Sequence, residues 1–403
     1  MPMPLQGIRV IDWTIWQQGP VCSAMLGDLG AEVIKIEERE KGDPGRGMLR
    51  MSGVDLSDRP NFYFEANNRN KKSLTLDLKK PAALEIVYKL IEKSDIFVQN
   101  YRFGVATRLG LGYETLRTYN PKLIYASATG YGPEGPDRAD PSFDQMGLAR
   151  SGLMLAAGEP DHPPLQIAGG IADQMGAIML AYGVITALLA RERFGVGQEI
   201  DASHLGSMIW LQGLSVAARL MMGFAIPRMP RKYASNPLWN HYCCSDGKWL
   251  CLGMLQPDRY WADFVRALGR PELAADERFI DLRVRAANAG AAVEALDAAF
   301  AGKPRDEWIR ILRASGDFIF TIVNSVDELP NDPQVLANGY VTDFDHPQFG
   351  KTQVVGMPLR LSQTPGSVRL PAPEFGQHTE EILTELLGYS WEQIGLLKDG
   401  RVI

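Results

Sequence analysis

Short apolar runs alternate with helical segments along the first half of the chain, and this alternation most narrowly limits the possible folds. Residues 7–13 (GIRVIDW) and 31–37 (AEVIKIE) have the β-branched, apolar composition of buried strands, and a helix is predicted between them over about 21–29. A strand, a helix and a second strand in so short a span predict parallel pairing through a crossover helix. We therefore expect an α/β fold with a doubly wound, Rossmann-like parallel sheet.

The same pattern continues through residue 129. Strands are predicted over 72–78, 95–101 and 123–129, and a helix is predicted to begin at Pro81. Ligands of such sheets bind beyond the carboxyl ends of the strands. The residues expected on that edge are Gln17, Gln18, Asn100, Tyr101 and Tyr131.

A long helix is predicted from about 173 to 193. It is apolar on nearly every face, which predicts burial in the core. Its longest apolar stretch, 176–190, is too short to cross a bilayer, so we expect no membrane partner. The N-terminus lacks the order of a signal peptide, which favours a cytoplasmic protein. A net charge of only -6 gives no reason to expect a nucleic-acid partner.

The composition changes around 224–240, where Pro, Arg and Asn are frequent. A hairpin is predicted around Asp246-Gly247, and helical segments follow to about 314. The chain is Pro-rich and loop-like from about 344, with a short helix near 379–387. We expect a large α/β domain, a small α+β domain with its entry linker, and a return segment that packs on the large domain. Their predicted bounds are 1–223, 224–328 and 329–403.

Several well-known motifs are absent from the sequence. It has no GxxxxGK[ST], GxSxG or HExxH, and no GxGxxG at the first βα turn, which argues against nucleotide hydrolysis, serine esterase chemistry and dinucleotide binding. The four cysteines form no CxxC pair, so neither zinc nor a disulfide framework is expected. Cys243 and Cys244 stand near His241, but a predicted hairpin is a poor place for a Cys/His nucleophile.

The most informative stretch is Gly169-Gly170-Ile171-Ala172-Asp173, at the start of the long apolar helix. The simpler explanation is that Asp173 caps the helix by accepting its free N–H groups. The alternative is that Asp173 is a nucleophile. The helix dipole would keep its carboxylate ionised, backbone N–H groups could stabilise an oxyanion, and a thiolate is a good enough leaving group for a carboxylate attack. The pattern alone leaves both explanations open.

A group of positively charged residues provides a second indication of a ligand site. Any one Lys or Arg is most simply a solvated surface charge, but a set on one edge of the sheet could bind a pyrophosphate and a ribose phosphate. Residues 198–205 could form one more strand after the long helix, and His204 there is most simply a structural histidine. The cations in the set are Arg39, Arg46, Lys71, Lys72, Arg102 and Arg108.

Segments spread along the chain resemble the class III CoA-transferases, the family of formyl-CoA:oxalate and carnitine CoA-transferases. They occur in the order found in that family and are LQGIRVIDWTIWQQGP (5–20), LGAEVIKIE (29–37), NRNKKSLTLDLK (68–79), VQNYRFGVATRLGLGYETL (98–116), NPKLIYASATGYGPEGP (120–136), IADQMGAIMLAYGVITALLARERFGVGQEID (171–201) and GQHTEEILTELLG (376–388).

The resemblance implies a mechanism and a set of site residues. The nucleophilic aspartate of the family falls on Asp173, which would become acylated and then carry CoA as a thioester. The substrates would be an acyl-CoA and a carboxylic acid, with no permanently bound cofactor or metal, and the chain would form an interlocked homodimer. The expected CoA-contacting residues are Gln17, Gln18, Leu76, Asp77, Leu78, Lys79, Asn100, Tyr101, Arg108, Pro141, Ser142, Phe143 and Asp144.

Two departures from the family pattern bear on the substrate. Glu38 stands where formyl-CoA transferases have a phosphate-contacting Arg, so this contact is expected from Arg39 or Arg46 instead. The glycine-rich loop of formyl-CoA transferases has no counterpart, because the matching stretch reads RKYASNPLWN (231–240). An acceptor acid larger than oxalate is therefore expected, with aromatic acids among the candidates.

Two other functions compete with CoA transfer. A racemase similar to α-methylacyl-CoA racemase needs two acid–base groups on opposite faces of its substrate. Phe143 takes the place of the histidine that racemases carry, which argues against this function. A non-catalytic CoA-binding protein is the third possibility, and an intact Asp173 argues against it.

Overall fold

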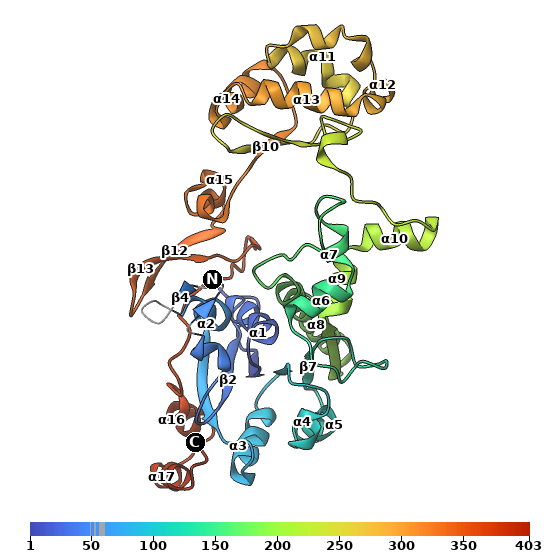
Figure 1. Cartoon of the computed structure of the whole chain (residues 1–403). Helices are drawn as coiled ribbons and strands as arrows, with labels where there is room; N and C mark the ends of the chain where they lie inside the picture. Colours follow the sequence, from blue (N-terminus) through green and yellow to red (C-terminus); the bar gives the residue numbers. More distant parts are fainter. Residues whose placement is uncertain (49, 52–53, 56–60) are drawn as a thin grey trace. The chain divides into compact units, whose positions relative to one another are not determined.

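The computed structural model describes residues 1–48, 50–51, 54–55 and 61–403 (Figure 1). The chain forms two compact units. The first comprises residues 1–155, 166–225 and 333–403, and the second comprises 156–165 and 226–332. The segment 156–165, which our predicted boundaries assign to the large domain, thus belongs to the second unit.

The first unit is built on a sheet of six parallel strands, in the order β5-β2-β1-β6-β7-β8. The chain order reverses direction between β1 and β6, which is the position where ligands bind in sheets of this type. The predicted mixed α/β fold with a parallel sheet is confirmed. The strands are β1 (Arg9–Trp13), β2 (Glu32–Glu38), β5 (Lys71–Leu76), β6 (Ile96–Gln99), β7 (Ile124–Thr129) and β8 (Gln198–Ser203).

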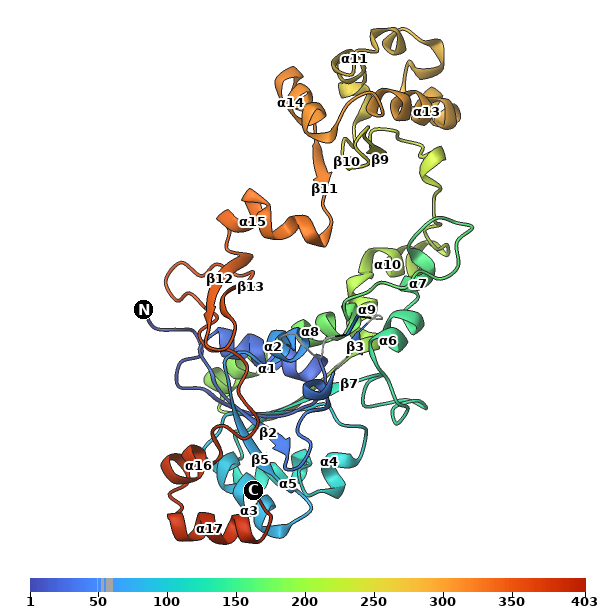
Figure 2. The same cartoon turned by 60° about the vertical axis from the view of Figure 1, so that its left-hand side comes forward.

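Helices cover both faces of this sheet (Figure 2). Apolar side chains of α1 and α8 pack on one face with Val10 and Val33, and those of α3 pack on the other face with Ile11 and Ile34. The alternation of neighbouring strand residues between the two faces explains why the strands are apolar throughout. The helices of the first unit include α1 (Gln18–Asp28), α2 (Phe62–Asn68), α3 (Pro81–Glu92), α4 (Val105–Arg108), α5 (Tyr113–Tyr119), α6 (Asp144–Arg150), α8 (Ile171–Phe194), α9 (His204–Leu211) and α10 (Gly213–Met222), and α7 (Leu153–Ala156) ends at its boundary.

Helix α8 is buried on one side only, so the prediction of burial on nearly every face is wrong for the single chain. Its small residues, such as Ala177 and Ala181, pack on the sheet. A second stripe stays exposed, with Ile178, Tyr182, Ile185 and Leu189 at 46%, 65%, 42% and 58%. The spacing of four, three and four residues places these side chains on one helix face, which the chain itself leaves uncovered.

The length argument against a membrane helix also fails. Helix α8 has 24 residues, so among the described residues it is long and apolar enough to span a bilayer by length and composition, as is the bent pair α9–α10 taken as one span. The inward face of α8 nevertheless packs against the sheet and α1, as in the core helix of an α/β protein.

The second unit contains a small antiparallel sheet, as predicted. Strands β9 (His241–Cys243) and β10 (Trp249–Leu252) flank the Asp246-Gly247 turn, and β11 (Phe320–Val323) pairs with β10. Aromatic side chains of the helices, such as Phe264 and Phe300, fill its core. The helices are α11 (Pro257–Ala267), α12 (Leu282–Ala287), α13 (Ala289–Phe300) and α14 (Arg305–Ser315).

The C-terminal segment has more regular structure than predicted. Strands β12 (Val341–His346) and β13 (Gly350–Val355) form an antiparallel hairpin where a loop was expected. The short helix near 379 begins as α16 (Thr379–Glu381) and continues as a π-helix over Ile382–Leu386. Two helices of this segment, α15 (Pro333–Ala337) and α17 (Trp391–Asp399), were not predicted from the sequence. Because β12 and β13 alternate mostly exposed with half-buried residues, they lack the apolar run that marks a buried strand.

A loop after β1 is held by side chains from other elements. The ammonium of Lys35 donates to the carbonyl of Thr14 at 2.8 Å and pairs with the Asp43 carboxylate at 2.8 Å. The Asp43 carboxylate also accepts from the N–H of Trp16, a residue with a φ of 65°. The Lys35 and Asp43 side chains are 0% and 1% exposed. Burial alone would lower the pKa of Lys35, but the carboxylates of Asp43 and Asp12 outweigh it and raise this pKa.

We predict that Lys35→Met lowers the free energy of unfolding by about 3–5 kcal/mol, because it leaves the buried Asp43 carboxylate without its partner. Urea unfolding followed by circular dichroism measures the change. Lys72→Met is the matched control, since Lys72 lies on a neighbouring strand with a side chain 31% exposed and pairs with Glu32 and Glu381. Its expected cost is about 0–1 kcal/mol. Equal effects of the two substitutions would contradict the structural role of Lys35.

Candidate active site

Asp173 lies in the first turn of α8, a helix that begins directly after two glycines with positive φ. Gly169 and Gly170 have φ values of 99° and 70°, a conformation that disfavours any side chain. A Cβ on Gly170 would also lie 2.4 Å from the side-chain nitrogen of Gln17. The glycines therefore give α8 its sharp start and let Gln17 approach the helix end.

The helix end is capped by Asp144 and not by Asp173. One oxygen of the Asp144 carboxylate accepts from the N–H of Ala172 at 2.6 Å and from the N–H of Asp173 at 3.2 Å. Burial raises the pKa of the Asp144 carboxyl more than these two hydrogen bonds lower it. The simpler explanation of Asp173 as the helix cap is thus wrong, and the N–H groups of Ala172 and Asp173 are already bound by Asp144.

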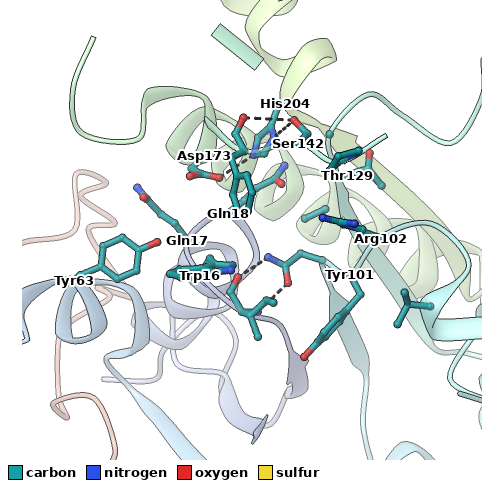
Figure 3. Close-up of a pocket in the computed structure, with 17 residues that line it drawn as sticks. Trp16, Gln17, Gln18, Tyr63, Tyr101, Arg102, Thr129, Ser142, Asp173 and His204 are labelled. Carbon is teal, nitrogen blue, oxygen red and sulfur yellow. Dashed lines mark hydrogen bonds and ion pairs between the residues drawn. The ribbon is translucent and has the colours of Figure 1, made fainter. Parts of the chain in front are cut away.

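The carboxylate of Asp173 forms a hydrogen bond with His204 (Figure 3). The Nε2 atom of His204 lies 2.9 Å from Oδ1 of Asp173, and the Asp173 side chain is 18% exposed. On the other side of the ring, Nδ1 of His204 lies 3.3 Å from the hydroxyl of Ser142. His204 is buried as expected of a structural histidine, but it contacts the candidate nucleophile, which the sequence analysis missed.

These side chains line a cavity of about 560 Å³ within the first unit (Figure 3). It opens at the carboxyl ends of β1, β6 and β7, as the parallel sheet predicts. Eight of the predicted site residues line it: Gln17, Gln18, Asn100, Tyr101, Pro141, Ser142, Phe143 and Asp173. The other lining residues are Ile15, Trp16, Tyr63, Arg102, Val105, Ala128, Thr129, Gly130 and His204.

The amide side chains in the cavity differ in what they bind. The Asn100 amide accepts from the N–H of Ile15 at 2.9 Å and donates to its carbonyl at 2.6 Å, so it anchors the loop after β1. The Gln18 amide donates to the carbonyl of Ala202 at 3.1 Å. The Gln17 amide lies against Gly170, beside the nucleophile's helix turn. Gln17 is therefore placed close to the start of α8.

Two tyrosines border the cavity. Burial raises the pKa of Tyr101 to about 12, and its ring stacks on Trp13 with a centroid distance of 4.0 Å. Burial also raises the pKa of Tyr63, and the nearby carboxylate of Asp173 raises it further. Both phenols stay protonated at neutral pH and keep an O–H donor, but the Tyr101 hydroxyl points away from Asp173 (Figure 3).

The remaining predicted residues lie outside the cavity wall. Asp144 caps α8. Arg39 donates to the main-chain oxygen of Ile403 at 2.7 Å, and Arg108 ends α4. Leu76 is the last residue of β5 and is buried, while the N–H of Asp77 bonds to the carbonyl of Val402 at 2.8 Å. The others of this stretch, Leu78 and Lys79, follow at the same carboxyl end.

Three members of the predicted cation set are not available to a phosphate group. Lys71 is 1% exposed and pairs with Asp12 at 2.8 Å, and Arg46 pairs with Glu37 at 2.7 Å. Lys72 pairs with Glu32 and Glu381. Lys71 and Lys72 begin β5, so they lie at its amino end, away from the ligand edge. Of the set, Arg102 lines the cavity.

Among the described residues, no group of three or more His, Cys, Asp or Glu side chains is arranged to hold a metal ion.

Comparison with known proteins identifies the family. The sequence model of CoA-transferase family III matches residues 5–379. The chain belongs to this family, which confirms the resemblance found in the sequence.

Relatives of established name span the whole chain. Succinyl-CoA–D-citramalate CoA-transferase of Chloroflexus aurantiacus is 32% identical over 404 residues, covering 100% of this chain and 98% of the relative. Succinyl-CoA:glutarate CoA-transferase of Mus musculus is 35% identical over 388 residues, covering 96% and 87%. The crystal structure of a CAIB/BAIF family protein from Brucella suis has a TM-score of 0.86 at 29% identity, covering 96% of this chain and 100% of that chain. This chain is accordingly a CoA-transferase whose substrates are CoA thioesters.

Proposed function

We propose that the chain transfers CoA between carboxylic acids through a covalent thioester on Asp173. The observation that carries this proposal is the position of the Asp173 carboxylate: it is 18% exposed at a cavity at the carboxyl edge of the sheet, and it is not used as the helix cap. The dipole at a helix N-terminus favours the anionic form of a carboxylate, and this is the form that attacks as a nucleophile. Asp144 fulfils the structural role and so leaves Asp173 free for chemistry.

The reaction proceeds in balanced steps. The Asp173 carboxylate attacks the carbonyl carbon of an acyl-CoA, forming a mixed anhydride and releasing the CoA thiolate. The thiolate attacks the Asp173 carbonyl carbon, forming the aspartyl-CoA thioester and releasing the first acid. The acceptor acid then repeats both steps in reverse. One thioester replaces another, so the overall free-energy change is small.

Replacing Asp173 tests this proposal. We expect Asp173→Asn to lower transfer at least about a thousandfold, because the neutral amide is a poor nucleophile. Assays of thioester exchange and mass spectrometry of the intact protein, mixed with succinyl-CoA, measure the change. Wild type should carry a CoA adduct that borohydride reduces, and the variant should not.

Asp399→Asn is the matched control, since Asp399 is an exposed residue at the end of α17. It should behave as wild type. Residual transfer by Asp173→Asn within tenfold of wild type would contradict the assignment.

A racemase is the second candidate, and the geometry argues against it. Racemisation requires acid–base groups on opposite faces of the α-carbon. His204 is hydrogen-bonded to Asp173 itself, and so lies on the same side of the cavity. Phe143, at the position of the racemase histidine, has no proton to transfer. Deuterium exchange at the α-carbon without a CoA adduct would support the racemase instead, and neither signal would indicate a non-catalytic CoA-binding protein.

We also propose an acceptor acid larger than oxalate. The cavity of about 560 Å³ has aromatic walls, in which the rings of Trp16 and Phe143 meet edge to face at a centroid distance of 6.5 Å. The named relatives act on citramalate and glutarate, which are also longer than oxalate. Apolar walls favour a substrate with a carbon chain or ring.

A panel of acceptors tests this expectation. With succinyl-CoA as donor, kcat/KM should be at least about tenfold higher for glutarate, citramalate or an aromatic acid than for oxalate or formate, because buried apolar contacts add about 1–3 kcal/mol. Liquid chromatography of the CoA products gives the rates. Oxalate or formate as the preferred acceptor would refute the proposed size of the site.

For the CoA nucleotide, we propose the exposed carboxyl ends of β5 and β6. Arg102 and Arg108 follow β6, and Lys79 follows β5. Glu38 accepts the N–H groups of Glu40 and Lys41, so this position is used for a turn. We assign to Arg102 the phosphate contact that Glu38 cannot make, since Arg39 and Arg46 are engaged elsewhere.

We further propose that the protein is a homodimer. The exposed apolar stripe of α8 is joined by exposed apolar residues of α9 and α10, including Trp210, Leu214 and Met221 at 72%, 82% and 82%. Monomeric soluble proteins rarely leave so many large apolar side chains in water. A second copy of the chain is the partner that the family resemblance implies.

Light scattering coupled to size-exclusion chromatography tests the dimer. The wild-type particle should have about twice the 44.6 kDa mass of the chain. Substituting Tyr182→Asp together with Leu189→Asp should prevent assembly, because two charges would be buried in the interface. Lys122→Asp, at an exposed turn, is the control. A wild-type monomer would refute the proposal.

A further inference from the structure

Three N–H groups at the start of α8 are bound by acceptors other than the Asp173 carboxylate. The N–H groups of Ala172 and Asp173 are bound by Asp144, and the N–H of Gln174 donates to the carbonyl of Gly170 at 2.8 Å. Within the described part of the chain, the hydrogen bond that reaches the Asp173 carboxylate comes from His204. The histidine therefore takes the place that helix N–H groups were expected to fill.

The hydrogen bonds of His204 define its tautomer. An ionised carboxylate only accepts hydrogen bonds, so the 2.9 Å contact with Asp173 requires the proton on Nε2. The hydroxyl of Ser142 can then donate to Nδ1, at 3.3 Å. With a hydrogen-bond partner at each ring nitrogen, the imidazole is oriented with Nε2 toward one oxygen of the nucleophile.

The ring is also fixed by packing. His204 is 4% exposed and begins α9, whose first turn is capped by the hydroxyl of Ser203. Helix α6 packs closely on it, since a Cβ on Gly147 would lie 2.7 Å from the Cβ of His204. A donor held this rigidly needs no reorganisation when charge develops on its partner.

We propose that His204 is a catalytic residue that stabilises the oxyanion formed when the CoA thiolate attacks the carbonyl carbon of Asp173. This inference rests on the proposed function. When the other carboxylate oxygen forms the anhydride bond, Oδ1 becomes the carbonyl oxygen that faces Nε2. As the new C–S bond forms, negative charge collects on Oδ1. The C–O bond to the leaving acid then breaks. No proton is transferred, because the attacking thiolate and the departing carboxylate are both anions.

This role predicts an effect on selected steps only. His204 contacts the oxygen of Asp173, so it acts when the Asp173 carbon is attacked, and not in CoA binding. A purely structural histidine would instead affect folding or the dissociation constant of CoA. The two roles can therefore be separated by measuring each quantity.

The test uses rapid-quench mass spectrometry of the full chain mixed with succinyl-CoA. His204→Leu removes the donor and should slow formation of the CoA adduct on Asp173 about a hundredfold, the usual cost of one oxyanion donor. The dissociation constant of CoA should stay within about twofold. His204→Gln, which keeps an N–H group at similar reach, should recover at least about tenfold of the loss.

The outcomes separate this inference from the proposed function. Adduct formation at the wild-type rate in His204→Leu would overturn the role of His204 and leave the role of Asp173 intact. No adduct in wild type would overturn the proposed function itself. Loss of rate in both variants with equal loss of CoA binding would show a structural role and overturn the inference.

A second measurement needs no substitution. Nitrogen NMR of the wild-type protein with labelled histidine reports which ring nitrogen carries the proton. We expect His204 signals that show a proton on Nε2. A ring protonated only at Nδ1 would turn a lone pair toward Asp173 and would overturn the inference.

Discussion

The site depends on how the loop after β1 is held. Three successive residues of this loop are each fixed by a side chain from elsewhere in the chain: Thr14 by Lys35 of β2, Ile15 by Asn100, and Trp16 by Asp43. The positive φ of Trp16 costs about 1–3 kcal/mol, so the loop needs such support. The next two residues, the glutamines at 17 and 18, then face the start of α8. Burying a charged side chain costs free energy. Here the buried pair of Lys35 and Asp43 sets the geometry of one wall of the cavity.

At the second wall of the cavity, formed by the start of α8, two carboxylates have different roles. Asp144 binds the N–H groups that begin α8, and Asp173, in the same turn, keeps its own carboxylate for the cavity. In a helix with a single acid, the cap and the nucleophile would compete for one side chain. His204 then gives the free carboxylate one donor and so distinguishes its two oxygens.

The alternation of strands and helices was sufficient to predict the parallel sheet and its ligand edge, because both follow from local apolar patterns. The local pattern could not predict that Lys71 forms an ion pair with Asp12 and Arg46 one with Glu37, because these contacts join separate elements. The importance of His204 was missed for the same reason: 31 residues separate it from Asp173. A signal was present in the serine at 203, which marks a helix start and so places the following histidine at the end of a strand, on the ligand edge.

The uncovered stripe of α8 could not be foreseen either, because a stripe that one chain leaves exposed has the same apolar sequence as one that the chain buries.

The covalent route through Asp173 can be tested most directly by following oxygen atoms. In this mechanism the acceptor acid attacks the aspartyl thioester, and one of its oxygens remains on the Asp173 carboxylate after the new acyl-CoA leaves. Turnover with an acceptor labelled with heavy oxygen, followed by mass spectrometry of the peptide that contains residue 173, should show that peptide gaining heavy oxygen. An unlabelled peptide after many turnovers would mean that CoA passes between the acids without bonding to Asp173.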